Sequence, residues 1–366
     1  MKVLAYLLYG RKAEYELELT LSILSALHQL GEDRSDVKIA IVTDRENLLP
    51  NFPVEILRVS AAELAAWQTT PAGHYHFRAK PCALLKVLDH FQCPAALLDT
   101  DTYFIQDPRK LFERISSTTS LMHESDNYKI GENPLWDPIT PHIKQGIEIG
   151  GVTISPESEM LNSGVIGITP DNRGLIEKSL TVLDRLFAIG PVFNVEQLAI
   201  GAVLSQYTQV ASCNDVVQHY WGSGYRKPFI HLAVSRLMQS NSSRPAELIA
   251  RQSVHVRPEF PKSAKRDVAL AKLMGKLRHW DGTYQFAWLA YCNALRQSRK
   301  DPELASIWAD TALTCLGKSL EARQQQPASS SLRRDFRRLS QPRLVALPWL
   351  TPRTKTAWHE FWNQLS

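Results

Sequence analysis

The sequence predicts an α/β domain with a largely parallel central sheet, followed by a mostly helical C-terminal region. Short apolar runs typical of buried strands occur at residues 3–8, 37–43, 54–59 and 95–98. Amphipathic stretches typical of helices separate them, and alternation of this kind is characteristic of parallel sheets with crossover helices. From about residue 236 onward the pattern becomes mostly helical. The chain therefore contains more than one structural region.

Each expected element has a local signal. A helix is expected over 13–30, ending at Gly31, and the run from Ser60 to Glu63 has the form of a capping box that opens another. Further helices are expected over 83–91, 171–189 and from Asn194, with strands at 160–168, 208–212 and 215–219. Residues 123–159 hold several prolines and glycines, which favours a binding loop or lid. Beyond 236, helices are expected over 264–279, 284–298 and 301–323.

Charge divides the chain in the same way. Residues 1–235 carry 20 Lys and Arg against 27 Asp and Glu, a net −7, whereas 236–366 carry 22 against 10, a net +12. We therefore expect a catalytic α/β domain over 1–235, a helical region over 236–323, and a linker with a basic aromatic tail over 324–366.

Composition limits the cellular context. The five cysteines are scattered without CxxC spacing, which favours reduced thiols in a cytoplasmic protein and disfavours a zinc site. No window approaches the roughly 18 to 20 apolar residues of a spanning helix. The N-terminal apolar run breaks at Gly10 and reads as a first strand instead of a signal peptide. A soluble protein, or one peripheral to the inner face of a membrane, is expected.

The segment ALLDTDTYF, residues 96–104, ends a buried strand on two acids. Asp99 and Asp101 would repel each other at the carboxyl edge of a sheet unless a cation lies nearby. Hard carboxylate oxygens suit Mg²⁺ or Mn²⁺, which in turn holds a diphosphate; a solvated strand end is the alternative. A phosphatase motif is disfavoured, because Tyr103 stands where that motif has Thr or Val.

Two later segments add to this pattern. Asn162, Ser163 and Gly164 are small or polar residues inside a strand pattern, which indicates close approach by a ligand or by backbone, or else a bulge. The segment HYWGSGYRKPF begins at His219, whose imidazole could complete a metal sphere begun by the two acids, although a lone histidine is more often structural.

These ordered pieces, together with VEQLAI at 195–200, resemble the nucleotide-sugar glycosyltransferases of the GT-A fold, closest to the family-8-like retaining enzymes. The resemblance covers roughly residues 1–230. It implies that Asp99, Asp101 and His219 bind Mn²⁺ or Mg²⁺. It also implies that Asn162, Glu196 and Gln197 lie at the reacting sugar, with Glu196 replacing the aspartate that the family has.

The resemblance implies further donor contacts. Gly222 and Lys227 correspond to the family's HxxGxxKP pattern, but the interval between them is two residues longer, so Arg226 shares the expected diphosphate role. Donor contacts are also expected from residues beside the main motifs, namely Tyr9, Gly10, Thr43, Asp44, Arg78, Lys86, Thr100, Ser163 and Gly164. For Lys86 a solvated helix face is the favoured alternative, and the Thr43–Asp44 pair also suits a simple helix-capping turn.

The tail combines Leu332–Leu339, which contains four arginines, with Trp349, Trp358, Phe361 and Trp362. It suits either peripheral contact with anionic lipid headgroups or packing as a cap on the acidic domain, in which case its tryptophans are core. Nucleic acid is not expected as a partner, because no binding motif accompanies the charge.

The expected function is metal-dependent transfer of a hexose from a nucleotide diphosphate sugar, UDP-linked by resemblance, to a hydroxyl of a glycan or lipid-linked acceptor, as in polysaccharide biosynthesis. The resemblance implies retention of anomeric configuration. Two alternatives come from other classes: a non-catalytic protein that binds nucleotide sugar or glycan, and a membrane-surface scaffold that uses the basic C-terminal region.

Overall fold

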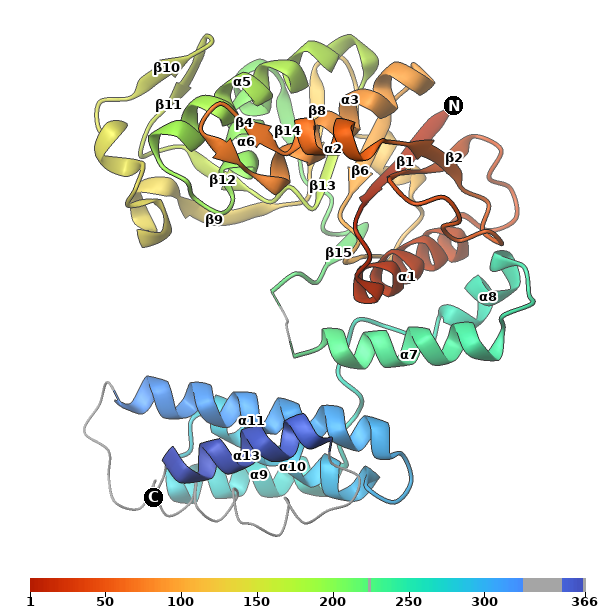
Figure 1. Ribbon diagram of the computed structural model, residues 1–366, viewed down its shortest axis with the longest axis vertical. Coiled ribbons are helices and arrows are strands. Elements are labelled where there is room, and N and C mark those ends of the chain that lie inside the picture. The colour runs from red at the N-terminus through yellow and green to blue at the C-terminus, as the bar shows by residue number, and fades with distance from the viewer. Residues whose placement is uncertain (223–224, 325–350, 365–366) are drawn as a thin grey trace. The chain divides into compact units, whose positions relative to one another are not determined.

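The computed structural model describes residues 1–222, 225–324 and 351–364, and the chain forms two compact units (Figure 1). The first comprises residues 1–222 and 233–258, and the second comprises 223–232 and 259–366. The domain boundary predicted at residue 235 stays a prediction, because a division into compact units does not test which parts of the chain fold independently. In the structure, helix α8 (Ala246–Ser253) beyond it packs on α1 (Ala13–Leu30) of the first unit.

A seven-stranded sheet forms the centre of the first unit. Its order is β14-β8-β13-β6-β1-β2-β3, and every strand runs in one direction except β13, which is antiparallel to both neighbours. This confirms the predicted α/β class with a mostly parallel sheet. The strands are β1 (Lys2–Leu8), β2 (Val37–Thr43), β3 (Glu55–Arg58), β6 (Ala95–Leu98), β8 (Thr119–Met122), β13 (Val165–Ile168) and β14 (Gln209–Ala211).

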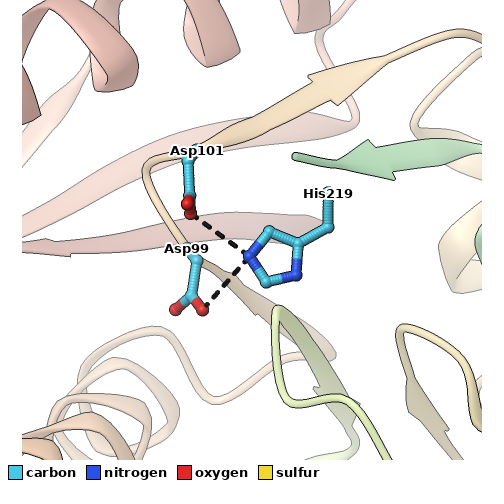
Figure 2. Close-up of side chains that lie close together, drawn as sticks. All are labelled: Asp99, Asp101 and His219. Atoms are coloured by element: carbon cyan, nitrogen blue, oxygen red, sulfur yellow. Dashed lines mark hydrogen bonds and ion pairs between the residues drawn. The ribbon is translucent and has the colours of Figure 1, made fainter. Parts of the chain in front are cut away.

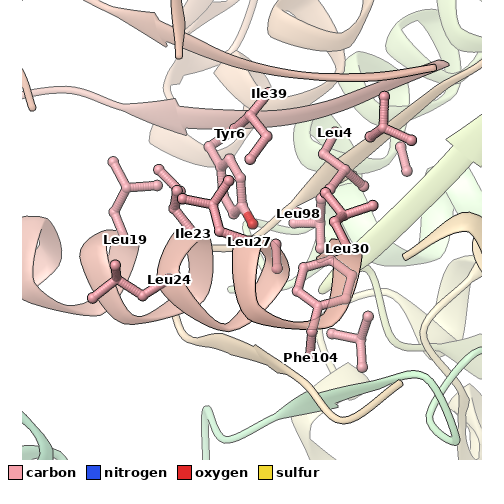
Figure 3. Packing of buried hydrophobic residues seen from close by; sticks show 14 of the residues in the cluster. Leu4, Tyr6, Leu19, Ile23, Leu24, Leu27, Leu30, Ile39, Leu98 and Phe104 are labelled. Atoms are coloured by element: carbon pink, nitrogen blue, oxygen red, sulfur yellow. The ribbon is translucent and has the colours of Figure 1, made fainter. Parts of the chain in front are cut away.

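Alternate residues of each strand supply two hydrophobic layers. Leu4 and Tyr6 of β1 face the layer built with α1, whereas Val3 and Ala5 face the layer built with α3 (Ala79–Phe91). Figure 3 shows the first layer, where the leucines of α1 cover Tyr6, Ile39 and Leu98. Both faces are therefore buried, as a parallel sheet requires.

The remaining helices of this unit are α2 (Ala61–Trp67), α4 (Arg109–Phe112), α5 (Arg173–Ile189), α6 (Val195–Tyr207) and α8, and α7 (Lys227–Ser240) leads into its last part. Single turns of 3₁₀ helix are η1 (His76–Arg78), η2 (Ile130–Glu132), η3 (Pro134–Trp136), η4 (Thr140–His142) and η5 (Pro170–Asn172). Four two-stranded ribbons complete it: β4 (Thr69–Thr70) with β5 (Gly73–His74), β7 (Thr102–Phe104) with β15 (Val217–His219), β9 (Ser125–Lys129) with β12 (Glu159–Leu161), and β10 (Ile147–Ile149) with β11 (Val152–Ile154).

Helix α1 forms where its sequence predicts it. Leu19, Ile23, Leu27 and Leu30 recur at spacings of three and four, so one face is apolar and buried. The helix ends because Gly31 adopts φ +71°, a conformation that favours glycine, while its N–H donates to the Leu27 carbonyl at 3.3 Å. The capping box from Ser60 to Glu63 is also confirmed at the start of α2.

One expectation is wrong, and another segment is more regular than expected, with its binding role still a prediction. The strand predicted over 160–168 is two strands, β12 and β13, because the chain leaves the strand conformation at Asn162–Gly164 and β12 pairs with β9 outside the main sheet. The segment 123–159, expected as a binding loop or lid, folds into ribbons and 3₁₀ turns around the buried Trp136 and packs on α5 and α6. Its apolar residues, sparse and aperiodic in sequence, converge in one core with residues of α5 and α6.

Buried hydroxyls join α1 to the segment after β6. The Tyr6 hydroxyl lies 2.9 Å from Ser22 Oγ, which lies 2.7 Å from Thr102 Oγ1, and Thr102 donates to the Asp99 carbonyl at 2.8 Å. One turn further along α1, Ser25 Oγ accepts from the Phe104 N–H at 2.9 Å. These bonds fix the backbone on both sides of Asp101.

The second unit is helical. It contains α9 (Lys265–Arg278), α10 (Gly282–Gln297), α11 (Pro302–Gln324) and α13 (Pro352–Gln364), packed around Tyr284, Trp308 and Trp358. Trp358 of the predicted tail is thus a core residue, whereas Leu332–Leu339 and Trp349 lie outside the described residues. Across the described part of the chain, no helix has the length and apolarity needed to cross a bilayer.

Replacing Ser25 by alanine tests the anchor of β7. The change leaves the buried Phe104 N–H without its acceptor, so we expect a loss of about 1–3 kcal/mol in the free energy of unfolding. Urea denaturation followed by circular dichroism measures it. Ser35→Ala, at an exposed turn, should change stability by less than about 0.5 kcal/mol. Equal midpoints for the two variants would show that the bond contributes nothing.

Candidate functional site

Asp99 and Asp101 lie in the short connection between β6 and β7, at the carboxyl end of the parallel strands. The Asp99 N–H donates to the Gly164 carbonyl at 2.9 Å, and the Asp99 carbonyl accepts from Thr102. The loop is therefore bonded to β13 on one side and to the hydroxyls beneath it on the other. Thr100, an expected donor contact, is the residue between the two acids and is partly exposed.

His219 reaches the same place from the end of β15. Antiparallel pairing sets His219 opposite Thr102 of β7, and the Tyr220 N–H donates to the Asp101 carbonyl at 3.1 Å. The imidazole Nε2 lies 3.2 Å from Asp101 Oδ1 and 3.7 Å from Asp99 Oδ2 (Figure 2). One ligand atom from each of the three residues lies within 4.8 Å of the other two. The structure brings the three predicted metal ligands together.

The turn at 162–164 fixes the orientation of this histidine. The side-chain oxygen of Asn162 accepts from the Gly164 N–H at 2.9 Å and lies 2.9 Å from His219 Nδ1. Since that oxygen can only accept, Nδ1 must carry a proton, and the remaining nitrogen, Nε2, points at the carboxylates. Asn162 is therefore the residue that sets the histidine tautomer.

Gly164 is a glycine because the histidine ring occupies the space of a side chain. A Cβ at this position would lie 2.1 Å from His219 Nδ1, closer than non-bonded atoms can approach. The sequence pattern predicted a close approach at this segment, and the approaching group is the imidazole. The expected donor contact of Gly164 itself stays a prediction.

The three residues suit a divalent cation. Two carboxylates and the imidazole Nε2 face one another, and a cation among the three groups would relieve the repulsion between the carboxylates. Carboxylate oxygens are ligands of Mg²⁺ and Mn²⁺, and an imidazole is more readily accepted by Mn²⁺ or a later transition metal than by Mg²⁺. The donor set therefore fits a divalent cation, and Mn²⁺ better than Mg²⁺.

Lys80 of α3 is a site residue that sequence analysis did not select. Its ammonium lies 2.8 Å from Asp99 and 3.2 Å from Glu196, and it also donates to Ser163 Oγ at 3.1 Å. These two carboxylates raise the pKa of Lys80 despite its burial, so it is charged. No local pattern distinguishes it from Arg78 and Lys86, the nearby basic residues of the same segment that the sequence analysis selected.

The two basic residues chosen from that segment lie elsewhere. Arg78 forms an ion pair with Asp184 of α5, at 2.8 Å, and Lys86 pairs with Glu63 of α2, also at 2.8 Å. Their positions on the helix explain the difference, because Lys80 lies two residues after Arg78 and six before Lys86 and faces another direction. The favoured alternative for Lys86, a solvated helix face, matches its partly exposed pairing.

Glu196 and Gln197 begin α6 and are buried within the same network. Glu196 accepts from Ser163 Oγ at 2.7 Å, and the Gln197 amide donates to Asp126 at 2.6 Å. Asp126, from β9, also lies 3.4 Å from the Asn162 amide, and burial raises its pKa above the ordinary value. The three predicted catalytic residues therefore converge, and Asp126 joins them from the segment expected as a lid.

His123 is a second residue that the sequence did not reveal. Its ring packs edge-on against His219, with ring centroids 5.4 Å apart, and its Nε2 donates to the Val217 carbonyl at 2.9 Å. Burial lowers the pKa of His123, so the ring is neutral near pH 7. It lies buried against the predicted metal ligand.

The expected nucleotide contacts lie at the carboxyl ends of β1 and β2. Tyr9 and Gly10 follow β1, while Thr43 ends β2 and is followed by Asp44. Arg45 ties the two ends together, because its guanidinium donates to the Gly10 carbonyl at 2.6 Å. Asp44 Oδ1 is buried and has no hydrogen-bond partner among the described residues. These four residues lie at the sheet edge that also carries Asp99.

The residues expected to contact the diphosphate belong to different units. Gly222 is the last residue of the first stretch of the first unit, and Arg226 and Lys227 belong to the second. Their roles stay predictions.

Gly164→Ala should displace His219 and weaken metal binding by about 10- to 100-fold, the range typical of lost ligand orientation. Isothermal titration of the purified protein with Mn²⁺ measures it. Gly174→Ala is the matched control, because a Cβ there meets nothing within 4 Å. Unchanged affinity in Gly164→Ala would exclude His219 as a ligand.

Lys80→Met should destabilise the protein by about 3–5 kcal/mol, because it leaves Asp99 and Glu196 without their buried counter-charge. Lys86→Met, which breaks a partly exposed pair with Glu63, should cost about 0–1 kcal/mol. Urea unfolding of both variants provides the comparison. Similar losses in the two would show that the Lys80 ion pairs are energetically ordinary.

Comparison with known proteins finds likeness in structure only. No protein-family model matches the chain, and no curated protein matches it. Among solved structures, mouse xyloside xylosyltransferase 1 in its apo form matches 58% of this chain and 85% of its own, with 12% sequence identity and a TM-score of 0.38. A likeness of this degree carries no statement about what this chain does, so the functional conclusion has to come from the site.

Proposed function

We propose that this protein is a metal-dependent glycosyltransferase that uses a nucleotide diphosphate sugar, UDP-linked, as donor for a hexosyl transfer. One observation carries the proposal: Asp99, Asp101 and His219, from separate parts of the sequence, converge at the carboxyl edge of a mostly parallel sheet. Such edges are where α/β sheets bind their ligands. The order of the motifs around these residues supports the same assignment.

Asp99, Asp101 and His219 would hold Mn²⁺ or Mg²⁺. When bound, the cation would neutralise the charge that develops on the departing diphosphate. The side chains around it have separate tasks. Asn162 keeps the histidine in the ligating tautomer, and Lys80 balances the charge of Asp99 and Glu196. Both groups are bonded in place before any substrate arrives, so no energy is lost in reorganising them.

In the proposed transfer the bond from the anomeric carbon to the diphosphate oxygen breaks, and a bond to the acceptor hydroxyl oxygen forms. The proton of that hydroxyl passes to the departing phosphate oxygen, as the family resemblance implies for retention of configuration. Asn162, Glu196 and Gln197 would position the sugar, while Arg226 and Lys227 would bind the diphosphate. The acceptor would be a hydroxyl of a glycan or of a lipid-linked sugar.

The proposal is tested with a panel of nucleotide sugars, with and without Mn²⁺. One donor should be hydrolysed slowly and only with metal, and Asp101→Ala should reduce the rate about 10²- to 10³-fold. Asp137→Ala, an exposed acid outside the site, is the control and should retain full activity.

Binding without turnover would point instead to a non-catalytic nucleotide-sugar protein. If no nucleotide sugar is bound or hydrolysed under any metal condition, the proposal is wrong.

A further inference from the structure

Helix α9 of the second unit exposes its leucines and buries two of its small residues. Leu270, Leu273 and Leu277 are 44%, 53% and 68% exposed, whereas Ala271 and Gly275 are buried. A helix of a soluble protein ordinarily does the reverse. The helix therefore presents an apolar row that the described fold leaves uncovered.

The packing of α9 on α10 fixes this orientation. A Cβ on Gly275 would lie 2.5 Å from the Gln285 side chain, so glycine lets the two helices approach without displacing that side chain. Asp267, buried on the same face, forms an ion pair with Arg296 of α10. Rotating α9 to bury its leucines would break both contacts. The outward direction of the leucines is thus built into the unit.

A basic row lies beside the leucines. Lys265, Lys272 and Lys276 are exposed and recur at spacings of seven and four, which places them on one stripe of the helix. The spacing of Leu270, Leu273 and Leu277 forms a neighbouring stripe. In all, the helix has five basic residues and one acid, and that acid is paired with Arg296. The partner of this surface should offer negative charge next to an apolar phase.

We propose that α9 is a peripheral docking surface for an anionic lipid bilayer. Leucines would enter the region between headgroups and acyl chains while the adjacent lysines contact the headgroup phosphates. This surface differs from the membrane contact that the sequence predicts for the tail. Helix α9 belongs to the described residues and combines exposed leucines with exposed lysines. This docking role does not depend on the proposed transferase activity.

Other occupants fit less well. A second copy of the helix would bring two basic rows together. The segment 325–350 of this chain has five arginines and one acid, so it would also repel α9. The described first unit exposes its large apolar residues singly on separate elements, among them Tyr15 of α1 and Leu248 of α8, so it offers no matching apolar row. Nucleic acid would pair with the lysines but gain nothing from the leucines.

The test is co-sedimentation of the full-length protein with vesicles. Phosphatidylcholine vesicles are compared with vesicles of phosphatidylcholine and phosphatidylglycerol in equal parts, at low and high salt. We expect binding only to the anionic vesicles, weakened by salt. Lys272→Glu with Lys276→Glu should reduce the binding constant by at least about fivefold for each lysine removed. Leu273→Ser with Leu277→Ser should abolish sedimentation.

Two control variants distinguish α9 from the rest of the protein surface. Leu248→Ser removes an equally exposed leucine from the first unit and should bind as wild type. Replacing Arg333, Arg334, Arg337 and Arg338 by glutamine tests the tail and should leave most of the binding intact. Thermal unfolding by circular dichroism shows that each variant is folded.

Three results would overturn the proposal. The first is absence of wild-type binding to anionic vesicles. The second is loss of binding in the tail variant while the leucine variant still sediments. The third is a wild-type dimer in solution that the leucine substitutions convert to monomer, which would identify a second copy as the occupant.

Discussion

The candidate site depends on the pairing of β7 with β15. These two short strands stand outside the main sheet, yet their register sets His219 beside the residue that follows Asp101. A slip of one residue would turn the imidazole to the other face of the ribbon and leave the acids without it. The ribbon is itself anchored through Ser25 and Thr102, which tie β7 to α1. A few buried hydrogen bonds thus connect the candidate site to α1, the helix that packs on the hydrophobic core.

Charge balance is the second constraint. Asp99 and Glu196 come within reach of one ammonium group, and Ser163 bridges the lysine and the glutamate. Burying these carboxylates together would be unfavourable without Lys80. Asp99 also faces His219 of the ribbon, whose Nε2 lies 3.7 Å from its Oδ2. The site is therefore organised around that single carboxylate, which belongs to both charge clusters.

Sequence patterns predicted the features that a few neighbouring residues determine. The strand ending on two acids, the helix that stops at Gly31 and the Ser60 capping box all follow short-range rules and are confirmed. Lys80 and His123 could not be found in this way, because their roles arise from contacts with residues distant in the chain. The regular structure of segment 123–159 could not be predicted for a related reason, because its core forms only against α5 and α6. The family resemblance grouped Asn162 with Glu196 and Gln197, whereas its contact with His219 comes from the structure alone.

The hydrogen bonds among the buried hydroxyls beneath Asp99 are all donated in the same direction. Because Thr102 uses its proton on the Asp99 carbonyl, Ser22 must donate to Thr102, and Tyr6 must donate to Ser22. One carbonyl oxygen therefore determines the orientation of three O–H dipoles that lie progressively deeper in the protein. Aligned bonds of this kind polarise one another, so the carbonyl that closes the row accepts a stronger bond than an isolated hydroxyl would give. The backbone at Asp99 is thus held by a row of aligned hydroxyls that begins at Tyr6 of β1.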